Sequence, residues 1–247
     1  MLALLAATLS PKRYEQMIDI MHRDDVLTSS GGGGGLQSGS DLYWISILGT
    51  PSTAAPWMFQ FGGHHLAINA SIVGNNSTLA PSLPAAQPVS LSLNGTTVRQ
   101  MGAAIDKSFA LVNALTPTQR TVAVLSGSYI DLVLRPGQDG KTIVPKGIKA
   151  SALTAAQQMQ LLDLAGEWIN ILNDADGTIK MAEVKANRAD TYFAWFGPTT
   201  ASSASNFRIQ GPTLHDSPQQ LSGSATKHTH TMYPELGNDY GAKWITQ

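Results

Sequence analysis

The sequence predicts an α+β protein with a central antiparallel or mixed β-sheet and flanking helices. Strand-like patterns fill two separate blocks, residues 41–100 and 191–247, and a mainly helical block, 101–190, lies between them. A helical start, 1–28, is joined to the first β block by a Gly/Ser-rich connection, 29–40. This order lacks the strand–helix alternation of a parallel sheet, so we treat the chain as one α+β domain.

Capping signals place the beginnings of three helices. Ser10 precedes Pro11, a pair typical of an N-cap and a first helical position, and the helix is expected to end near Leu27. Thr116 and Thr154 are each followed three residues later by Gln, which matches a capping box. The second box opens the longest predicted helix. The face that we expect to pack on the sheet comprises Leu161, Leu164, Trp168 and Leu172.

Residues that favour β-structure mark the strands. Segments 43–48, 58–61 and 65–73 lie in the first β block, and 192–196, 206–210 and 229–233 lie in the second. Asn94-Gly95 between two short strand-like runs predicts a hairpin. The stretch 78–88 carries three prolines and is expected to be a loop.

Composition excludes several functional classes. Only 13% of the residues are charged and the formal net charge is -1, so nothing in the chain draws it to nucleic acid. The absence of cysteine excludes disulfides, thiolate metal ligands and a cysteine nucleophile. The apolar start, residues 1–9, is too short to span a membrane, and no other segment is long and apolar enough.

Two histidine pairs carry the strongest chemical signal. His64 and His65 follow Gly62-Gly63, and His228 and His230 lie in a strand-like run far along the chain. Imidazole is the commonest protein ligand for zinc, copper and iron. We therefore predict a divalent transition metal (zinc, copper or iron) as cofactor, held by these four histidines, and no organic cofactor. The alternative is that one histidine of each pair hydrogen-bonds a backbone carbonyl.

A single metal would be held best by His65, His228 and His230. The rings of a His-X-His run on a strand point to one face, whereas adjacent strand residues point to opposite faces. His64 would join the same metal only if the backbone bends at Gly62-Gly63. Asp216 or Asp239 can complete the ligand set with a carboxylate.

Arg208 is the candidate for binding an anion. It lies among aromatic and amide residues on a predicted strand, where a guanidinium can bind a substrate carboxylate or phosphate. The sequence favours a surface ion pair over this role. The candidate catalytic residues are thus Asp216, Arg208 and Asp239.

Several motifs resemble, in the same order, those of the DUF3500 family, whose function is unknown. They are GHHL at 63–66, FAW-GP at 193–198, RIQGPT at 208–213, HxHT-Y at 228–233 and NDYG at 238–241. The resemblance implies an additional N-terminal region in other members, and export of many of them. Where this chain is located is therefore left open.

The chain departs from the family pattern at two places. An Ile-Glu-Tyr run is expected after the Gly-Pro-Thr segment, but the chain continues Leu214-His215-Asp216, so that Asp216 can stand where the family has Glu. An Arg-Asp-Pro run is expected after Tyr233, but the chain reads Pro234-Glu235-Leu236. Both departures bear on whether this member keeps the family's activity.

Together these observations predict a metal-dependent enzyme, a hydrolase or an oxidoreductase, acting on a small-molecule or peptide-like substrate. Two alternatives remain open. The histidines of a non-catalytic binding or structural protein would only hold strands together, and a decayed enzyme would keep the fold without the chemistry. The sequence indicates neither the oligomeric state nor the reaction.

Overall fold

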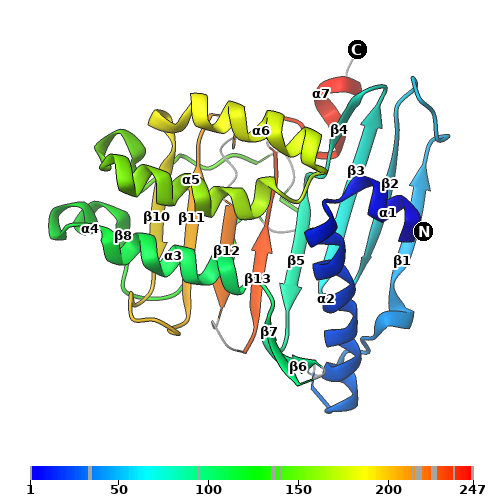
Figure 1. Ribbon diagram of the computed structural model, residues 1–247, viewed down its shortest axis with the longest axis horizontal. Coiled ribbons are helices and arrows are strands. Elements are labelled where there is room, and N and C mark those ends of the chain that lie inside the picture. Colours follow the sequence, from blue (N-terminus) through cyan, green and yellow to red (C-terminus); the bar gives the residue numbers. More distant parts are fainter. Residues whose placement is uncertain are drawn as a thin grey trace.

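Strands from both β blocks join in one eleven-stranded sheet, seen in the computed structural model of Figure 1. The structure describes residues 2–245 apart from 33–34, 94, 135–136, 139–140, 213, 215–218, 224–226 and 236. Along the sheet the strands are β1 (Trp44–Leu48), β2 (Trp57–Gly63), β3 (Leu66–Val73), β5 (Ser82–Ala86), β13 (Thr229–Met232), β12 (Gln219–Gly223), β11 (Ser205–Gln210), β10 (Tyr192–Phe196) and β8 (Val124–Ser126).

The remaining strands extend or flank this sheet. β4 (Asn76–Thr78) pairs with β3, and β9 (Ile148–Lys149) pairs with β10. A separate hairpin joins β6 (Ser90–Leu93) to β7 (Thr96–Arg99), as predicted around Asn94, which itself lies outside the described residues. The described pairings are antiparallel except for the parallel pair β8–β10. The fold is α+β with a mixed sheet, which confirms the predicted class.

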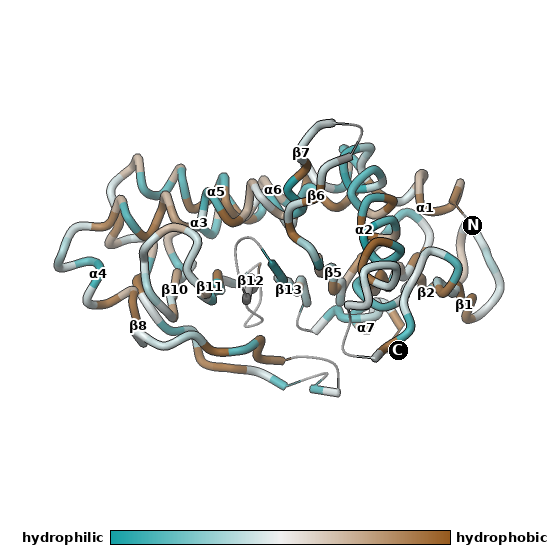
Figure 2. Tube along the Cα trace, turned by 90° about the horizontal axis from the view of Figure 1, so that it is seen from below, coloured by the Kyte–Doolittle hydropathy of each residue, from teal (hydrophilic) through white to brown (hydrophobic). Residues whose placement is uncertain are grey.

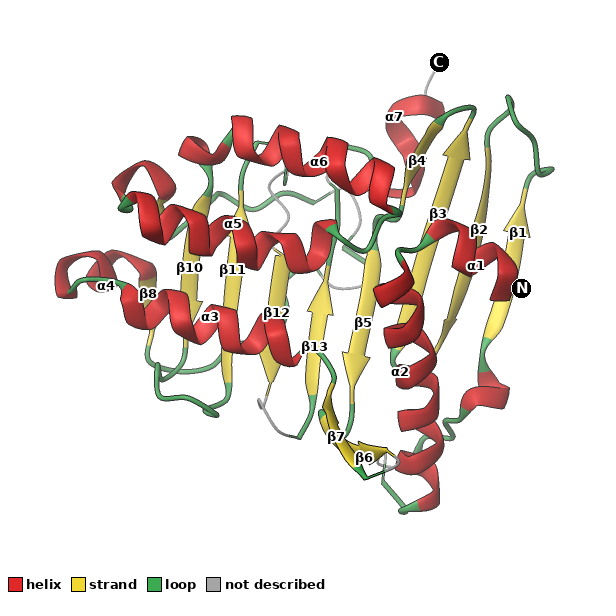
Figure 3. Ribbon diagram, in the orientation of Figure 1, coloured by secondary structure: helices red, strands yellow, loops and turns green. Residues whose placement is uncertain are grey.

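The longer helices lie on one side of the sheet (Figures 2 and 3). They are α1 (Leu2–Thr8), α2 (Pro11–Ser29), α3 (Gly102–Ala114), α4 (Pro117–Ala123), α5 (Ala155–Ile169) and α6 (Asp174–Ala186). Short elements complete the chain: η2 (Ser40–Leu42), η3 (Ala150–Ala152), η4 (Arg188–Asp190), η5 (Asp239–Gly241) and α7 (Ala242–Ile245). Within the described residues, no helix combines the length and apolarity that a membrane crossing requires.

The predicted caps determine where three helices begin. The Ser10 side chain accepts a hydrogen bond from the backbone N–H of Arg13, with Pro11 at the first helical position. Both capping boxes form, at Thr116 and at Thr154. Each cap satisfies backbone donors that the first helical turn leaves unpaired.

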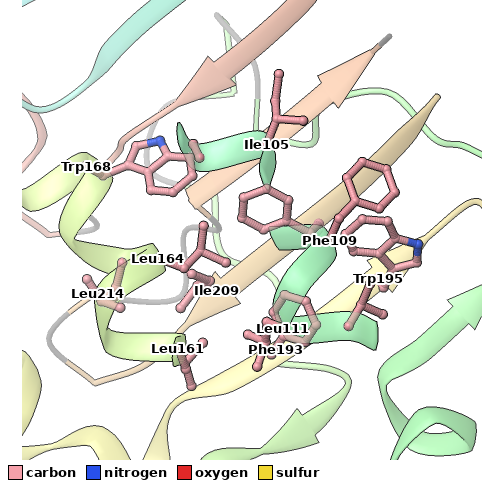
Figure 4. Close-up of a cluster of buried hydrophobic side chains, with 14 of the residues drawn as sticks. Ile105, Phe109, Leu111, Leu161, Leu164, Trp168, Phe193, Trp195, Ile209 and Leu214 are labelled. Atoms are coloured by element: carbon pink, nitrogen blue, oxygen red, sulfur yellow. The ribbon is translucent and has the colours of Figure 1, made fainter. Parts of the chain in front are cut away.

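Two hydrophobic clusters lie between the helices and the sheet. One joins α3 and α5 to β10 and β11, where Phe109, Trp195 and Ile209 pack with the α5 face (Figure 4). Trp168 of that face also donates its indole N–H to Thr231 of β13 at 2.6 Å. The other cluster packs α1 and α2 on β2 and β3, and Leu172, beyond the end of α5, belongs to it. The predicted packing of the α5 face on the sheet is therefore confirmed for its first three residues.

The prediction of a loop over 78–88 is wrong, because β5 lies there in the middle of the sheet. Its donors are divided between residues next to the two neighbouring strands: Ser82 donates its N–H to the carbonyl of Tyr233, just after β13, and Ala85 donates to that of His65, just before β3. Pro84 pairs with Leu66 without needing an N–H of its own. A strand this short makes so few ladder bonds that proline is tolerated. β8 likewise occurs in a block that was expected to be mainly helical.

Candidate metal centre

Strand β5 brings the two histidine pairs to the same end of the sheet. His65 directly precedes β3, and His230 lies on β13, the strands on either side of β5. Ala85 of β5 pairs with His230 and donates its N–H to the His65 carbonyl at 2.7 Å. One residue of the central strand thus contacts both segments, although they lie far apart in the sequence.

The imidazoles of three histidines converge. The ring centroid of His65 lies 5.3 Å from that of His228 and 6.1 Å from that of His230. Nε2 of His228 and Nε2 of His230 are 2.7 Å apart, and one donates a hydrogen bond to the other. One candidate ligand nitrogen from each of the three lies within 4.8 Å of the others. This agrees with the convergence that the sequence predicted, and these groups can hold a metal ion.

His64 and His65 occupy the tight turn between β2 and β3. Gly63 pairs directly with Leu66, which leaves only the two histidines in the turn. Their rings lie on the same side, with centroids 3.9 Å apart, so the strand rule that sends neighbours to opposite faces does not apply. The glycine is required because a Cβ at Gly63 would lie 2.8 Å from the Tyr43 ring. The predicted bend is therefore present, but the group of converging ligand atoms comprises His65, His228 and His230, and His64 instead groups with Asp24 and His65.

A buried carboxylate supports His65 from behind. Nδ1 of His65 donates to Oδ1 of Asp24 at 2.6 Å, and the Tyr43 hydroxyl donates to Oδ2 at 2.7 Å. Burial works to raise the pKa of Asp24, but the hydrogen bonds from His65 and Tyr43 outweigh it and hold the pKa below its usual value. Because Asp24 occupies Nδ1, Nε2 of His65 remains available to face a metal, as metal-binding histidines usually require.

Sequence reasoning missed Asp24 and Tyr43. Asp24 lies in a charged run of α2 that resembles a solvated helix face. The available signal was its spacing, since it falls on the same stripe as the buried Met17, Ile20 and Leu27. A carboxylate on an apolar helix stripe is buried and therefore needs a hydrogen-bond partner, which here is His65.

Burial favours the neutral form of three imidazoles, those of His64, His228 and His230. Burial, followed by the charges of His230, His65 and His64, lowers the pKa of His228 to about 4. Burial also lowers the pKa of His230 and of His64, against the opposing influence of Asp131 and Asp24 respectively. Neutral imidazoles keep the nitrogen lone pair that a metal needs.

The histidines border an open cleft of about 570 Å³. Its floor includes Pro84 and Ala85 of β5, and the segment that follows β8 contributes Tyr129, Asp131 and Leu132. The volume lies in the range of small-molecule sites. Asp131 is a carboxylate of this cleft that the sequence did not single out.

The predicted acidic residues are not at this centre in the described structure. Asp239 belongs to η5, beyond the other end of β13 and β5, where it accepts a hydrogen bond from the N–H of Glu235 at 2.7 Å. Asp216 lies outside the described residues. Arg208 is buried on β11, two strands from His230.

Comparison with known proteins supports the family resemblance. The sequence model of DUF3500, described as a protein of unknown function, matches residues 1–242. We found no match among curated proteins or among solved structures. The family match covers nearly all of the 247 residues, including both histidine segments, Asp24 and Tyr43. The chain is therefore a member of the DUF3500 family.

Proposed function

We propose that the protein is a metal-dependent enzyme whose metal is held by His65, His228 and His230. The observation that carries the proposal is the combination of three converging imidazoles with a buried carboxylate on the far nitrogen of one of them. A carboxylate–histidine pair behind a ligand is a recurring feature of protein metal sites, because it fixes the ring and its tautomer.

Three histidines leave room for a further ligand in the cleft. Catalytic zinc sites use three protein ligands and keep one position for water or substrate, whereas structural sites are closed by four. When bound, the metal would act as a Lewis acid or as a redox centre on a small-molecule or peptide-like substrate. All-histidine ligand sets suit zinc, copper and iron, so each of these metals remains a candidate.

This chain's own residues would prepare the site. Asp24 orients His65, and Tyr43 holds Asp24. His64 lies beside them, with its Nδ1 3.5 Å from Asp24 Oδ1, and forms a second group of potential ligands with Asp24 and His65. Asp131 also lines the cleft, and its carboxylate would accept a proton from a substrate or water.

The test is metal content and affinity in matched variants. Elemental analysis of the purified protein, and titration of the metal-free protein with Zn²⁺, Cu²⁺ and Fe²⁺, should give one tightly bound ion per chain. His65→Ala and His230→Ala should abolish that binding while circular dichroism shows an intact fold. His22→Ala removes an exposed histidine of α2 and should leave metal binding unchanged.

A structural role for the histidines is the second candidate, favoured by the hydrogen bond between His228 and His230. It predicts no stoichiometric metal in the parent protein and a large loss of stability in His65→Ala and His230→Ala. A protein that binds one metal ion but turns over no ester, amide or oxidisable substrate would instead be a decayed enzyme.

A further inference from the structure

The sheet face opposite the helices carries a row of buried polar side chains on β11. Phe207 and Ile209 are fully buried in the cluster under α3 and α5. Because side chains alternate along a strand, Asn206, Arg208 and Gln210 project from the other face. Their exposed fractions are only 0%, 9% and 1%. A buried polar row of this kind requires partners.

Arg208 has no anionic partner among the described residues. Its guanidinium carbon lies 4.4 Å from the centroid of the Phe196 ring, and its Nε is buried without a hydrogen-bond partner. Burial lowers the pKa of Arg208, and no negative charge in the described part of the chain offsets the loss of water. Buried cations in proteins are normally paired, because desolvation is otherwise uncompensated.

Asn206 adds a second group without a partner. Both the nitrogen and the oxygen of its side-chain amide are buried, and neither finds a hydrogen bond within the described part of the chain. Native proteins leave few such atoms unpaired, and those that remain often mark a place for a water, an ion or a ligand. Asn206 and Arg208 are consecutive residues on this face.

The strand register connects this row with the histidine cleft. Asn206 pairs with Ser222 of β12, and Ser222 pairs with His230 of β13. Directly paired residues of an antiparallel sheet lie on the same face, and two strand spacings amount to about 10 Å. Arg208 is the next residue of this face along β11. His230 and Arg208 thus lie on one face of the sheet, two strands apart, a separation that a small molecule can span.

One segment contacts both places. The chain after β8 lines the histidine cleft with Tyr129, Asp131 and Leu132, and further along it accepts a hydrogen bond from Gln210 Nε2 at the Ile143 carbonyl, at 3.3 Å. Figure 2 shows this segment on the side of the sheet away from α3 and α5. In its described parts, this segment therefore borders the cleft and contacts the polar row at Gln210.

We infer that Arg208 and Asn206 bind a carboxylate of the substrate, whose reacting group is then held beside His230. This inference rests on the proposed function, since it assigns the substrate class of the same site. A guanidinium offers two parallel N–H donors that match a carboxylate, and the Asn206 amide can donate a third. The row supplies one positive charge, which matches a monoanionic carboxylate better than a phosphate.

The test measures anion binding in the metal-free protein, so that it does not depend on the metal. Sodium acetate and inorganic phosphate are titrated while NMR follows the Arg208 Nε–H resonance and the backbone amides of residues 205–210. Acetate should shift these signals saturably, and Arg208→Gln should weaken binding at least about tenfold. Arg99→Gln, which removes an exposed guanidinium paired with Asp106, should leave acetate binding unchanged.

Each other outcome overturns the inference. Binding of phosphate without acetate contradicts the carboxylate class, and binding of neither anion, or equal binding to Arg208→Gln, contradicts the subsite. Thermal stability provides a second readout. Arg208→Gln should leave the melting temperature unchanged or raise it, whereas Arg23→Gln should lower it, because Arg23 is paired with Asp19 and three backbone carbonyls. A loss in Arg208→Gln as large as that in Arg23→Gln would assign Arg208 a structural role.

The metal proposal and this inference fail separately. Acetate binding to the metal-free protein and to His230→Ala supports the subsite even if no metal is ever found. Conversely, if the protein binds a metal but acetate does not shift the NMR signals of β11, the proposed function stands and the inferred carboxylate substrate class is wrong.

Discussion

Nδ1 of His65 donates a 2.6 Å hydrogen bond to Oδ1 of Asp24, a fully buried carboxylate 41 residues earlier in the chain. The bond joins helix α2 to the turn between β2 and β3, and it directs the free nitrogen of His65 toward His228 and His230. Burying a charged carboxylate costs free energy, because the charge loses its hydration. We attribute the burial of Asp24 to its role in orienting His65 as a metal ligand.

Asp24→Asn should weaken metal binding while the chain stays folded. The amide oxygen can still accept from Nδ1 of His65, but the negative charge that strengthens the ligand is lost. Loss of such a supporting group lowers metal affinity about 10–100-fold. Competition with a chelator of known affinity measures the change. Asp25→Asn, at the exposed neighbouring position, is the control and should bind as the parent does; equal affinities in all three proteins would contradict the role of Asp24.

Tyr43→Phe should destabilise the protein and weaken metal binding slightly. It removes the 2.7 Å hydrogen bond to Asp24 Oδ2 and leaves that buried oxygen unpaired. The expected loss in the free energy of unfolding is about 1–3 kcal/mol. Urea denaturation measures it, with Tyr14→Phe at a half-buried position of α2 as the matched substitution. A loss in Tyr43→Phe no larger than in Tyr14→Phe would show that the hydroxyl contributes nothing.

The metal-free protein should gain stability as the pH rises from about 4 to 6.5. The pKa of His228 is about 4 in the folded protein against 6.5 as its ordinary value, so the unfolded chain binds more protons in this window. The free energy of unfolding therefore increases with pH there and is unaffected by His228 above it. Denaturation curves between pH 4.5 and 7.5 should show a shallower slope for His228→Asn than for the parent. Identical slopes would refute the shifted pKa.

Glu235→Gln should cost stability without changing the metal site. Glu235 forms an ion pair with Lys180 and accepts hydrogen bonds from Thr78 and Asn238, beyond the end of β13 that is opposite His228. Burial works to raise the pKa of Glu235, but Lys180 outweighs it and holds the pKa below its usual value.

Breaking such a mostly buried pair costs about 3 kcal/mol. The stabilising effect of Glu235 is present above the pKa of an unfolded glutamate and is lost as the pH falls through the lower folded value. The difference in unfolding free energy between parent and variant should therefore shrink in acid. Metal affinity should remain that of the parent, and a loss of metal binding in Glu235→Gln would contradict the separation of the two regions.

Local patterns predicted the elements better than their arrangement. The caps at Ser10, Thr116 and Thr154 act within one turn of the chain, and the sequence therefore shows them directly. β5 was not predicted, because the three prolines of segment 78–88 indicated a loop. The strand is short, and its few N–H donors bond to residues on both sides of it. Its central place depends on the partners His65 and Tyr233, which no local pattern reveals.

The site shows the same limit. The histidines were recognisable from their pairing and residue type, whereas Asp24 looked like part of a charged helix surface. Its role depends on the packing of α2 against the β2–β3 turn, which only the folded chain displays. Arg208 is without an anionic partner among the described residues, and this depends on the surroundings of β11, so the sequence favoured a surface ion pair over a ligand site.

The most direct test of the metal centre is anomalous X-ray scattering from crystals of the protein purified without chelator. Data collected on both sides of the zinc, copper and iron absorption edges would locate and identify the ion. We predict one peak, about 2.0–2.1 Å from Nε2 of His65, His228 and His230. A crystal grown with added metal that shows no peak at these three nitrogens would contradict the central claim.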